Sequence, residues 1–303
     1  MQENLVKYNI PYLRDSTLDI AREIDNHFAK KPINKFVLLV AIVGFFLDVY
    51  PIFLGDDVVI NSLKALGRAI PIEAANRLGE LVPKLLLKPE TFQAGKKLLD
   101  FLCKDQNIAT RLLKNTNDAE KLCEFFAKYG DEARTLFKNI SKKYGDDITE
   151  RIWHNPAYAD DAVKKAIFKD LDTISNVNGA GKLADDISTC NNLGKAFEAE
   201  VAAKNVSNVA EVSKPLKTTS GSTDIDVFLE DGTIIEAKRF DFSKYPPGSS
   251  EYNDLKADLG RKIKIWYEHS ATCNKKVVFK GSVEDGIKTW LEEVKKVVVE
   301  VIP

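Results

Sequence analysis

Acidic and basic side chains occupy a part of the chain where two strands would normally carry apolar ones. Asp224 and Asp226 lie in one stretch rich in β-branched residues, and Glu236 and Lys238 lie in the next, beyond an Asp-Gly pair. Two such stretches around an Asp-Gly turn predict a β-hairpin. Carboxylate oxygens are the ligands that Mg²⁺ prefers, and a cation held beside a lysine suits hydrolysis of a phosphodiester. These residues therefore predict a metal-dependent hydrolytic site.

The register of this hairpin decides whether its carboxylates can meet. A two-residue type I′ turn would pair Val227 with Glu236 and leave Asp226 on the opposite face from Glu236. A three-residue connection, with Gly232 at positive φ, pairs Asp226 with Glu236 instead. We favour the second register, because it separates a polar face from an apolar one. The polar face would carry Asp224, Asp226, Phe228, Ile234, Glu236 and Lys238, and the apolar face Ile225, Val227, Leu229, Ile235 and Ala237.

The elements around the hairpin are expected to build an α/β or α+β domain, a mixed sheet flanked by helices. Turn residues at 175–182 predict a linker, and its Gly179-Ala-Gly-Lys182 lacks the spacing of a phosphate-binding loop. The patterns that follow predict helices at about 193–205, 250–269 and 282–293, and strands at 206–213, 223–229, 233–240, 275–280 and 296–302.

Asp226 followed by Glu236-Ala237-Lys238 resembles the signature of the PD-(D/E)XK nucleases, which have the restriction-endonuclease-like fold. That family usually places a glutamate on a helix before these strands, and Leu193-Gly194-Lys195-Ala196-Phe197-Glu198 matches its pattern of a glycine followed by Phe-Glu. The resemblance covers roughly residues 190–303. It implies a Mg²⁺- or Mn²⁺-dependent endonuclease with Asp226, Glu236, Lys238 and Glu198 as catalytic residues.

The resemblance also implies a role for each residue. Asp226, Glu236 and the carbonyl of Ala237 would bind the cation, Lys238 would orient the nucleophile, and Glu198 would hold a metal-bound water or a second cation. Asp224 is an additional carboxylate, which leaves open which aspartate is the ligand. We expect these groups to face a solvated site. Residues that could grip phosphate, or simply form a solvated surface, are Arg239, Lys244, Lys256, Arg261, Lys262 and Lys264.

The first part of the chain reads as an all-α domain, expected over residues 1–185, with the nuclease-like domain over 186–303. Short helices are predicted between recurring Gly-Asp and Ala-Asp pairs near 130, 145 and 159, where glycine suits a helix end and aspartate an N-cap. Such segments ahead of a compact nuclease loosely resemble bacterial polymorphic toxins, including contact-dependent growth inhibition effectors. That resemblance implies a cognate inhibitor protein as a partner, and a homodimer is a further hypothesis.

Composition limits the other classes of function. Lys and Arg number 44 against 45 Asp and Glu, for a net charge of −1, so nucleic-acid contact would need a local patch. Four cysteines without CxxC spacing and three scattered histidines argue against a zinc site or a disulfide framework. No signal peptide is visible at the N-terminus, so we expect a cytoplasmic protein or a secreted effector. An apolar run at 36–47 is short for a membrane span and favours a core helix.

Three functions are thus compared. The first is a metal-dependent endonuclease, acting on DNA in preference to structured RNA such as tRNA. The second is a module that keeps the fold but binds nucleic acid or a partner without catalysis. The third is a membrane-active or partner-recruiting protein that acts through the apolar run, continued to residue 54.

Overall fold

The computed structural model describes residues 56–303, and the apolar run at 36–54 lies outside them. The chain divides into two compact units, residues 1–142 and 143–303, each of which is described by itself. The described part of the first unit is helical. Its helices are α4 (Asp56–Ala69), α5 (Ile72–Leu87), α6 (Phe92–Lys104), α7 (Gln106–Leu112) and most of α8 (Thr116–Tyr144).

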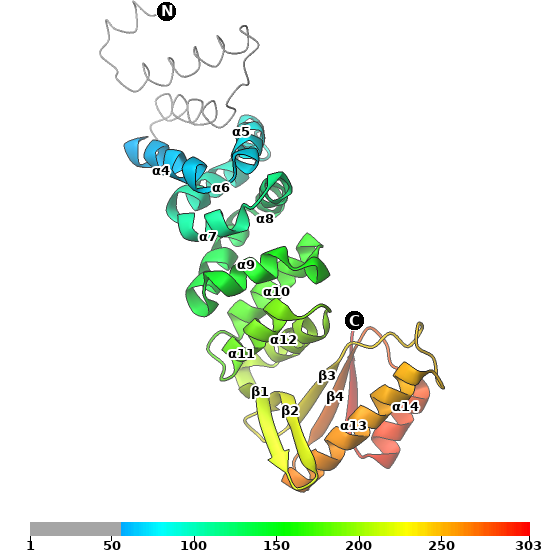
Figure 1. The fold of residues 1–303 in the computed structure, drawn as a ribbon. Helices are drawn as coiled ribbons and strands as arrows, with labels where there is room; N and C mark the ends of the chain where they lie inside the picture. Colours follow the sequence, from blue (N-terminus) through cyan, green and yellow to red (C-terminus); the bar gives the residue numbers. More distant parts are fainter. Residues whose placement is uncertain (1–55) are drawn as a thin grey trace, which may run out of the picture. The chain divides into compact units, whose positions relative to one another are not determined.

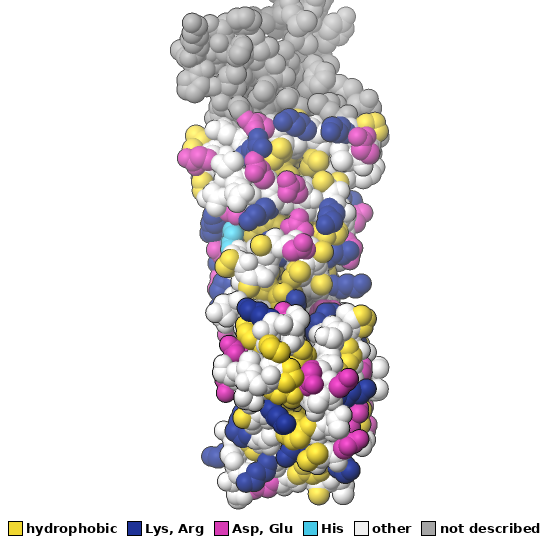
Figure 2. All heavy atoms as spheres, turned by 90° about the vertical axis from the view of Figure 1, so that its right-hand side faces the viewer, with side chains coloured by type: hydrophobic (Ala, Val, Ile, Leu, Met, Phe, Trp, Pro, Cys, Tyr) yellow, Lys and Arg dark blue, Asp and Glu magenta, His cyan; other side chains and the backbone are white. Residues whose placement is uncertain are grey.

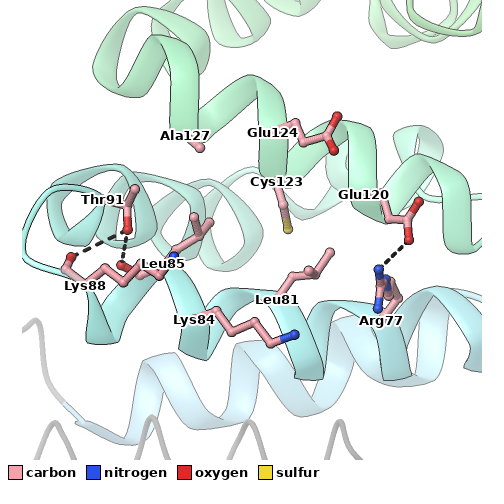
Figure 3. A pocket seen from close by; sticks show the side chains of 10 residues that line it. All are labelled: Arg77, Leu81, Lys84, Leu85, Lys88, Thr91, Glu120, Cys123, Glu124 and Ala127. Carbon is pink, nitrogen blue, oxygen red and sulfur yellow. Dashed lines mark hydrogen bonds and ion pairs between the residues drawn. The ribbon is translucent and has the colours of Figure 1, made fainter.

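Four phenylalanines pack together in the core of the helical unit: Phe101, Phe125, Phe126 and Phe137. A surface pocket lies between α5 and α8 (Figure 3), and Arg77 there forms ion pairs with Glu80 and Glu120. Burial raises the pKa of the Cys123 thiol, which lines this pocket, to about 12, so the thiol is protonated at neutral pH. The pocket contains none of the residues predicted to do chemistry.

Glycine and aspartate punctuate the helices largely as the sequence predicts. Gly130, with φ 51°, interrupts α8, and Gly145, with φ 92°, precedes α9 (Asp146–His154). Asp160 is the N-cap of α10 (Asp161–Thr173), where its side chain accepts hydrogen bonds from two backbone N–H groups. At α9 the prediction differs in detail, because Gly145 occupies the N-cap position and Asp146 belongs to the first turn.

The second unit contains both helices and a sheet. The turn η1 (Pro156–Tyr158) links α9 to α10, and α11 (Ala180–Thr189) and α12 (Gly194–Lys204) follow. Helix α11 contacts α9 and strand β1, and α12 contacts α10 and strand β3. The boundary expected at 185/186 therefore falls within α11, inside the second unit.

A five-stranded mixed sheet forms the centre of the second unit, with the strands in chain order from edge to edge (Figure 1). The turn η2 (Val206–Asn208) leads into the sheet, whose first three strands are antiparallel, while the third, fourth and fifth run parallel. The strands are β1 (Val209–Thr218), β2 (Gly221–Leu229), β3 (Ile234–Lys238), β4 (Lys275–Lys280) and β5 (Val298–Ile302). The mixed sheet and the helical region before it confirm the coarse fold class.

Strand β1 departs from the prediction. A strand was expected at 206–213, but β1 continues through Pro215 to Thr218 and forms a hairpin with β2. Proline lacks the N–H that an interior strand needs, and β1 accommodates it because it lies at an edge of the sheet. The stretch at 206–208 forms η2 instead.

Helix α13 (Ser250–His269) lies along one face of the sheet, with α14 (Asp285–Thr289) and the turn η3 (Trp290–Val294) beside it (Figure 1). Ser249 is the N-cap of α13, since its hydroxyl accepts the N–H of Tyr252. The apolar cluster beneath α13 joins residues from the strands to residues from the helices: Leu216, Ile225, Ile234, Val277, Phe279, Leu255, Leu259, Ile263, Trp266, Ile287 and Leu291. This packing fixes α13 against the strands that carry the predicted site.

Candidate active site

The hairpin between β2 and β3 has the register that the sequence favours. Val227 pairs with Ile235 and Phe228 with Ile234, so the same register places Asp226 opposite Glu236. The Leu229 N–H donates to the carbonyl of Thr233, and Gly232 has φ 84°. The three-residue connection is therefore confirmed, and the alternative pairing of Val227 with Glu236 is wrong.

The alternation of faces along β2 is interrupted at Asp226, which the sequence did not predict. Ile225 belongs to the apolar cluster under α13, although it was expected to share a face with Val227. Asp226 lies opposite Ser213, between the pairs Val212–Val227 and Lys214–Ile225. Ser213 has φ 50°, a left-handed conformation that redirects a strand. The irregularity therefore sets Asp226 apart from the regular pleat of β2.

Asp224 is separated from the other acidic residues by this interruption. Its carboxylate pairs with the Lys182 ammonium of α11 at 2.7 Å, and both side chains are about half exposed. Its predicted place on one face with Glu236 is therefore wrong. Lys182 belongs to the Gly-Ala-Gly-Lys segment, and Asn178, the residue just before that segment, accepts the N–H of Val212 on β1 at 2.9 Å.

The Asp226 carboxylate is tied to the neighbouring strand. Its Oδ2 atom accepts the backbone N–H of Ala237 at 2.8 Å, and its side chain is almost entirely buried. In an antiparallel pair, the N–H and carbonyl of one residue point toward the same neighbour. The Ala237 carbonyl, predicted to be a metal ligand, therefore points toward β2, the strand that carries Asp226.

Glu236 lies at the centre of the site and is 0% exposed. Its Oε1 atom forms ion pairs with two ammonium groups, that of Lys238 at 2.8 Å and that of Lys262 from α13, and it accepts a hydrogen bond from Lys262. Its Oε2 atom is buried and has no hydrogen-bond partner. The expectation of a solvated face is thus wrong for Glu236, because α12 packs on β3 and the Lys262 side chain of α13 reaches the carboxylate.

Lys238 is held by two carboxylates, since its ammonium also lies 3.3 Å from Asp258 of α13. Asp258 pairs in turn with Arg261 at 2.9 Å, one helical turn later. Burial favours the neutral amine of Lys238, but the charges of Glu236 and Asp226 outweigh it and raise the pKa of Lys238. Lys238 therefore carries its charge at neutral pH.

Helix α12 contributes the third carboxylate. Glu198 is 7% exposed and pairs with Lys195 of the same helix at 2.7 Å. Burial raises the pKa of Glu198, and the charge of Glu236 adds to that rise. Burial likewise raises the pKa of Asp226 well above its usual range, with further contributions from Glu236 and Glu198. Helix α12 packs on both β2 and β3, so these three elements bring the carboxylates into one region.

The carboxylates and the carbonyl of the site are suitable ligands for a divalent cation, although lysine ammonium groups pair with the carboxylates in this structure. Within residues 56–303, no three His, Cys, Asp or Glu side chains are arranged as a ready metal cage. Three oxygen-bearing groups nevertheless converge, and the buried Oε2 atom of Glu236 lacks the partner that a buried polar atom normally has. Hard cations take such oxygen ligands. Asp226, Glu236 and the Ala237 carbonyl could therefore hold Mg²⁺ or Mn²⁺.

The six residues predicted to grip phosphate lie in different surroundings. Lys262 is inside the site, and Arg261 donates to the Ser222 carbonyl at 3.1 Å as well as pairing with Asp258. Lys256 lies over the ring of Trp290. Arg239, Lys244 and Lys264 are exposed, as is Arg261. On the face seen in Figure 2, basic side chains are interspersed with acidic ones, in keeping with the near-zero net charge.

Three residues of the site were missed from the sequence: Lys195, Asp258 and the inward position of Lys262. The spacing of Lys195 and Glu198, one helical turn apart, could have indicated their pairing. Asp258 and Lys262 are four residues apart and so share a face of α13. Nothing local indicates that this face meets β3.

Comparison with protein-family models, curated proteins and solved structures finds no match to this chain. The site must therefore be interpreted from its own geometry. Among the described residues, none of the helices has the length and apolar character needed to span a bilayer.

Proposed function

We propose that the chain is a metal-dependent endonuclease that hydrolyses phosphodiester bonds, with DNA the preferred substrate and structured RNA the second. The observation that carries the proposal is geometric: Asp226 lies opposite Glu236, Lys238 pairs with Glu236 at 2.8 Å, and the buried Glu198 lies on α12, which packs on β2 and β3. Carboxylates buried close together are costly to a fold unless they serve a site. The order α12, β1, β2, β3, α13, β4 is also the one expected from the resemblance to PD-(D/E)XK nucleases.

Each residue of the site has a defined task in this proposal. Asp226, Glu236 and the Ala237 carbonyl would hold the cation, which when bound supplies polarisation of the phosphoryl oxygen and a more acidic water. The Lys238 ammonium would donate to the phosphate or orient the attacking water, with Asp258 fixing its position. Glu198 would hold a metal-bound water or a second cation.

A second candidate is a binding module that keeps the fold without catalysis. The observation that favours it is the neutralisation of the site, in which Lys195, Lys238 and Lys262 pair with the carboxylates. Such a module would bind nucleic acid or a partner equally well with a chelator present.

Incubating the purified full-length chain with plasmid DNA and total RNA, in Mg²⁺, Mn²⁺ or EDTA, separates the two candidates. We expect cleavage with either cation and none with EDTA. Glu236→Gln and Lys238→Ala should each lower the rate by about 10² to 10³, the usual cost of losing one charged group of an active site. Glu200→Gln is the matched control, because Glu200 lies on α12 but pairs with Lys204 and Lys280. Undiminished cleavage by Glu236→Gln would overturn the assignment.

A further inference from the structure

The carboxylates of the site are matched by an equal number of lysines, more than metal-assisted hydrolysis requires. Three acidic side chains, Asp226, Glu236 and Glu198, lie among three lysines, Lys238, Lys262 and Lys195, and Glu236 pairs with two of these lysines. Lys238 suffices for the task that a nuclease of this type gives to a lysine. The presence of Lys262 and Lys195 therefore needs a separate explanation.

Lys262 and Lys195 are attached differently from Lys238. Lys238 has a second carboxylate partner, Asp258, which would keep Lys238 in the site if a cation bound Glu236. The ion pairs of Lys262 and Lys195 are with Glu236 and Glu198 respectively, and the two ammonium groups come from different helices. Both side chains are mostly shielded, with 15% and 30% of their surfaces exposed. Their loss from the site would leave Glu236 paired with Lys238 alone and would remove the ion pair of Glu198.

We propose that Lys262 and Lys195 are built-in counterions that compete with the divalent cation for Glu236 and Glu198. This inference rests on the proposed function. In the metal-free protein the two ammonium groups stabilise carboxylates that would otherwise repel each other in a buried place. The cation binds only as these ammonium groups leave, so its affinity is weaker than the carboxylates alone would give.

The test compares Mn²⁺ binding, by calorimetry, to the full-length wild type and to variants without nucleic acid. Lys262→Met removes the competing charge and retains much of the side-chain volume. We expect it to bind Mn²⁺ at least about tenfold more tightly, since 1.4 kcal/mol of lost competition corresponds to a factor of ten. Lys262→Arg keeps the positive charge and should bind like the wild type. Lys264→Met, an exposed position on the same helix, should also leave the affinity unchanged.

Thermal unfolding supplies a second readout that does not depend on activity. Without metal, Lys262→Met should melt at a lower temperature than the wild type, and saturating Mn²⁺ should raise its melting temperature by more than it raises that of the wild type. Should Lys262→Met not fold, Lys195→Met removes the other counterion and should likewise bind Mn²⁺ more tightly than the wild type.

The failures of this inference and of the proposed function are distinguishable. If the wild type cleaves nucleic acid and binds Mn²⁺, but the methionine variants bind it equally or more weakly, the competing role of the lysines is refuted while the nuclease stands. If neither wild type nor variants bind Mn²⁺ and no substrate is cleaved, both proposals fail. Loss of stability that Mn²⁺ does not restore would indicate lysines with a structural role alone.

Discussion

Replacing Gly179 by alanine tests the contact between the start of α11 and β1. This contact positions the part of β1 that lies opposite Asp226. Gly179 has φ 82°, and a Cβ atom added there would lie 1.9 Å from the carbonyl oxygen of Val212. No side chain can occupy that space unless the backbones of α11 and β1 separate. The substitution should therefore break the Asn178–Val212 hydrogen bond that joins the two segments.

Two other glycines separate the contributions to this cost. Gly232 also has positive φ, but nothing lies within 4 Å of its added Cβ, so Gly232→Ala should cost only the left-handed conformation, about 1 to 2 kcal/mol. Gly181 lies in α11 with open space around it, and Gly181→Ala should stabilise the helix by about 0.5 to 1 kcal/mol. Gly179→Ala has the same conformational cost as Gly232→Ala, and it also loses a hydrogen bond worth about 1 to 3 kcal/mol and creates a steric clash. Its total cost should therefore be about 3 kcal/mol or more.

Urea unfolding of the full-length chain, followed by tryptophan fluorescence, measures these differences. All three tryptophans, Trp153, Trp266 and Trp290, lie in the second unit, so the signal reports that unit alone. We expect the order of stability Gly181→Ala, wild type, Gly232→Ala, Gly179→Ala. A Gly179→Ala variant as stable as Gly232→Ala would refute the close contact between α11 and β1.

Two further predictions concern individual carboxylates. Burial, with help from Glu200, raises the pKa of Asp170 from its ordinary 3.8 to about 6, so folded protein retains a proton that unfolded chain has released, and stability falls as pH rises through this interval. Between pH 4 and pH 7, the free energy of unfolding of Asp170→Asn relative to that of the wild type, measured with urea, should increase by on the order of 2 kcal/mol. A difference between the two proteins that does not change with pH would contradict this. Asp224→Asn should cost no more than about 1 kcal/mol, because the pair with Lys182 is exposed, and should leave Mn²⁺ affinity in calorimetry unchanged. A loss of Mn²⁺ binding in that variant would make Asp224 a ligand.

The order of elements and the hairpin register could be predicted from the sequence because their signals are local. A strand's side chains alternate with period two, and Gly232 provides the positive φ that a three-residue connection requires. Together these place Asp226 opposite Glu236. The helix at 250–269 and the strand at 275–280 likewise have the predicted bounds.

The surroundings of the carboxylates were decided by tertiary packing. Lys262 reaches Glu236 across 26 residues of sequence, and in a chain with 44 lysines and arginines no local pattern distinguishes it from its neighbours. The interruption of the pleat at Asp226 depends on the left-handed Ser213 of another strand. The sequence therefore determined which carboxylates share a hairpin, because alternation and turn geometry act over a few residues. Only the folded structure determined which cations meet them, because that depends on how α12 and α13 pack against the sheet.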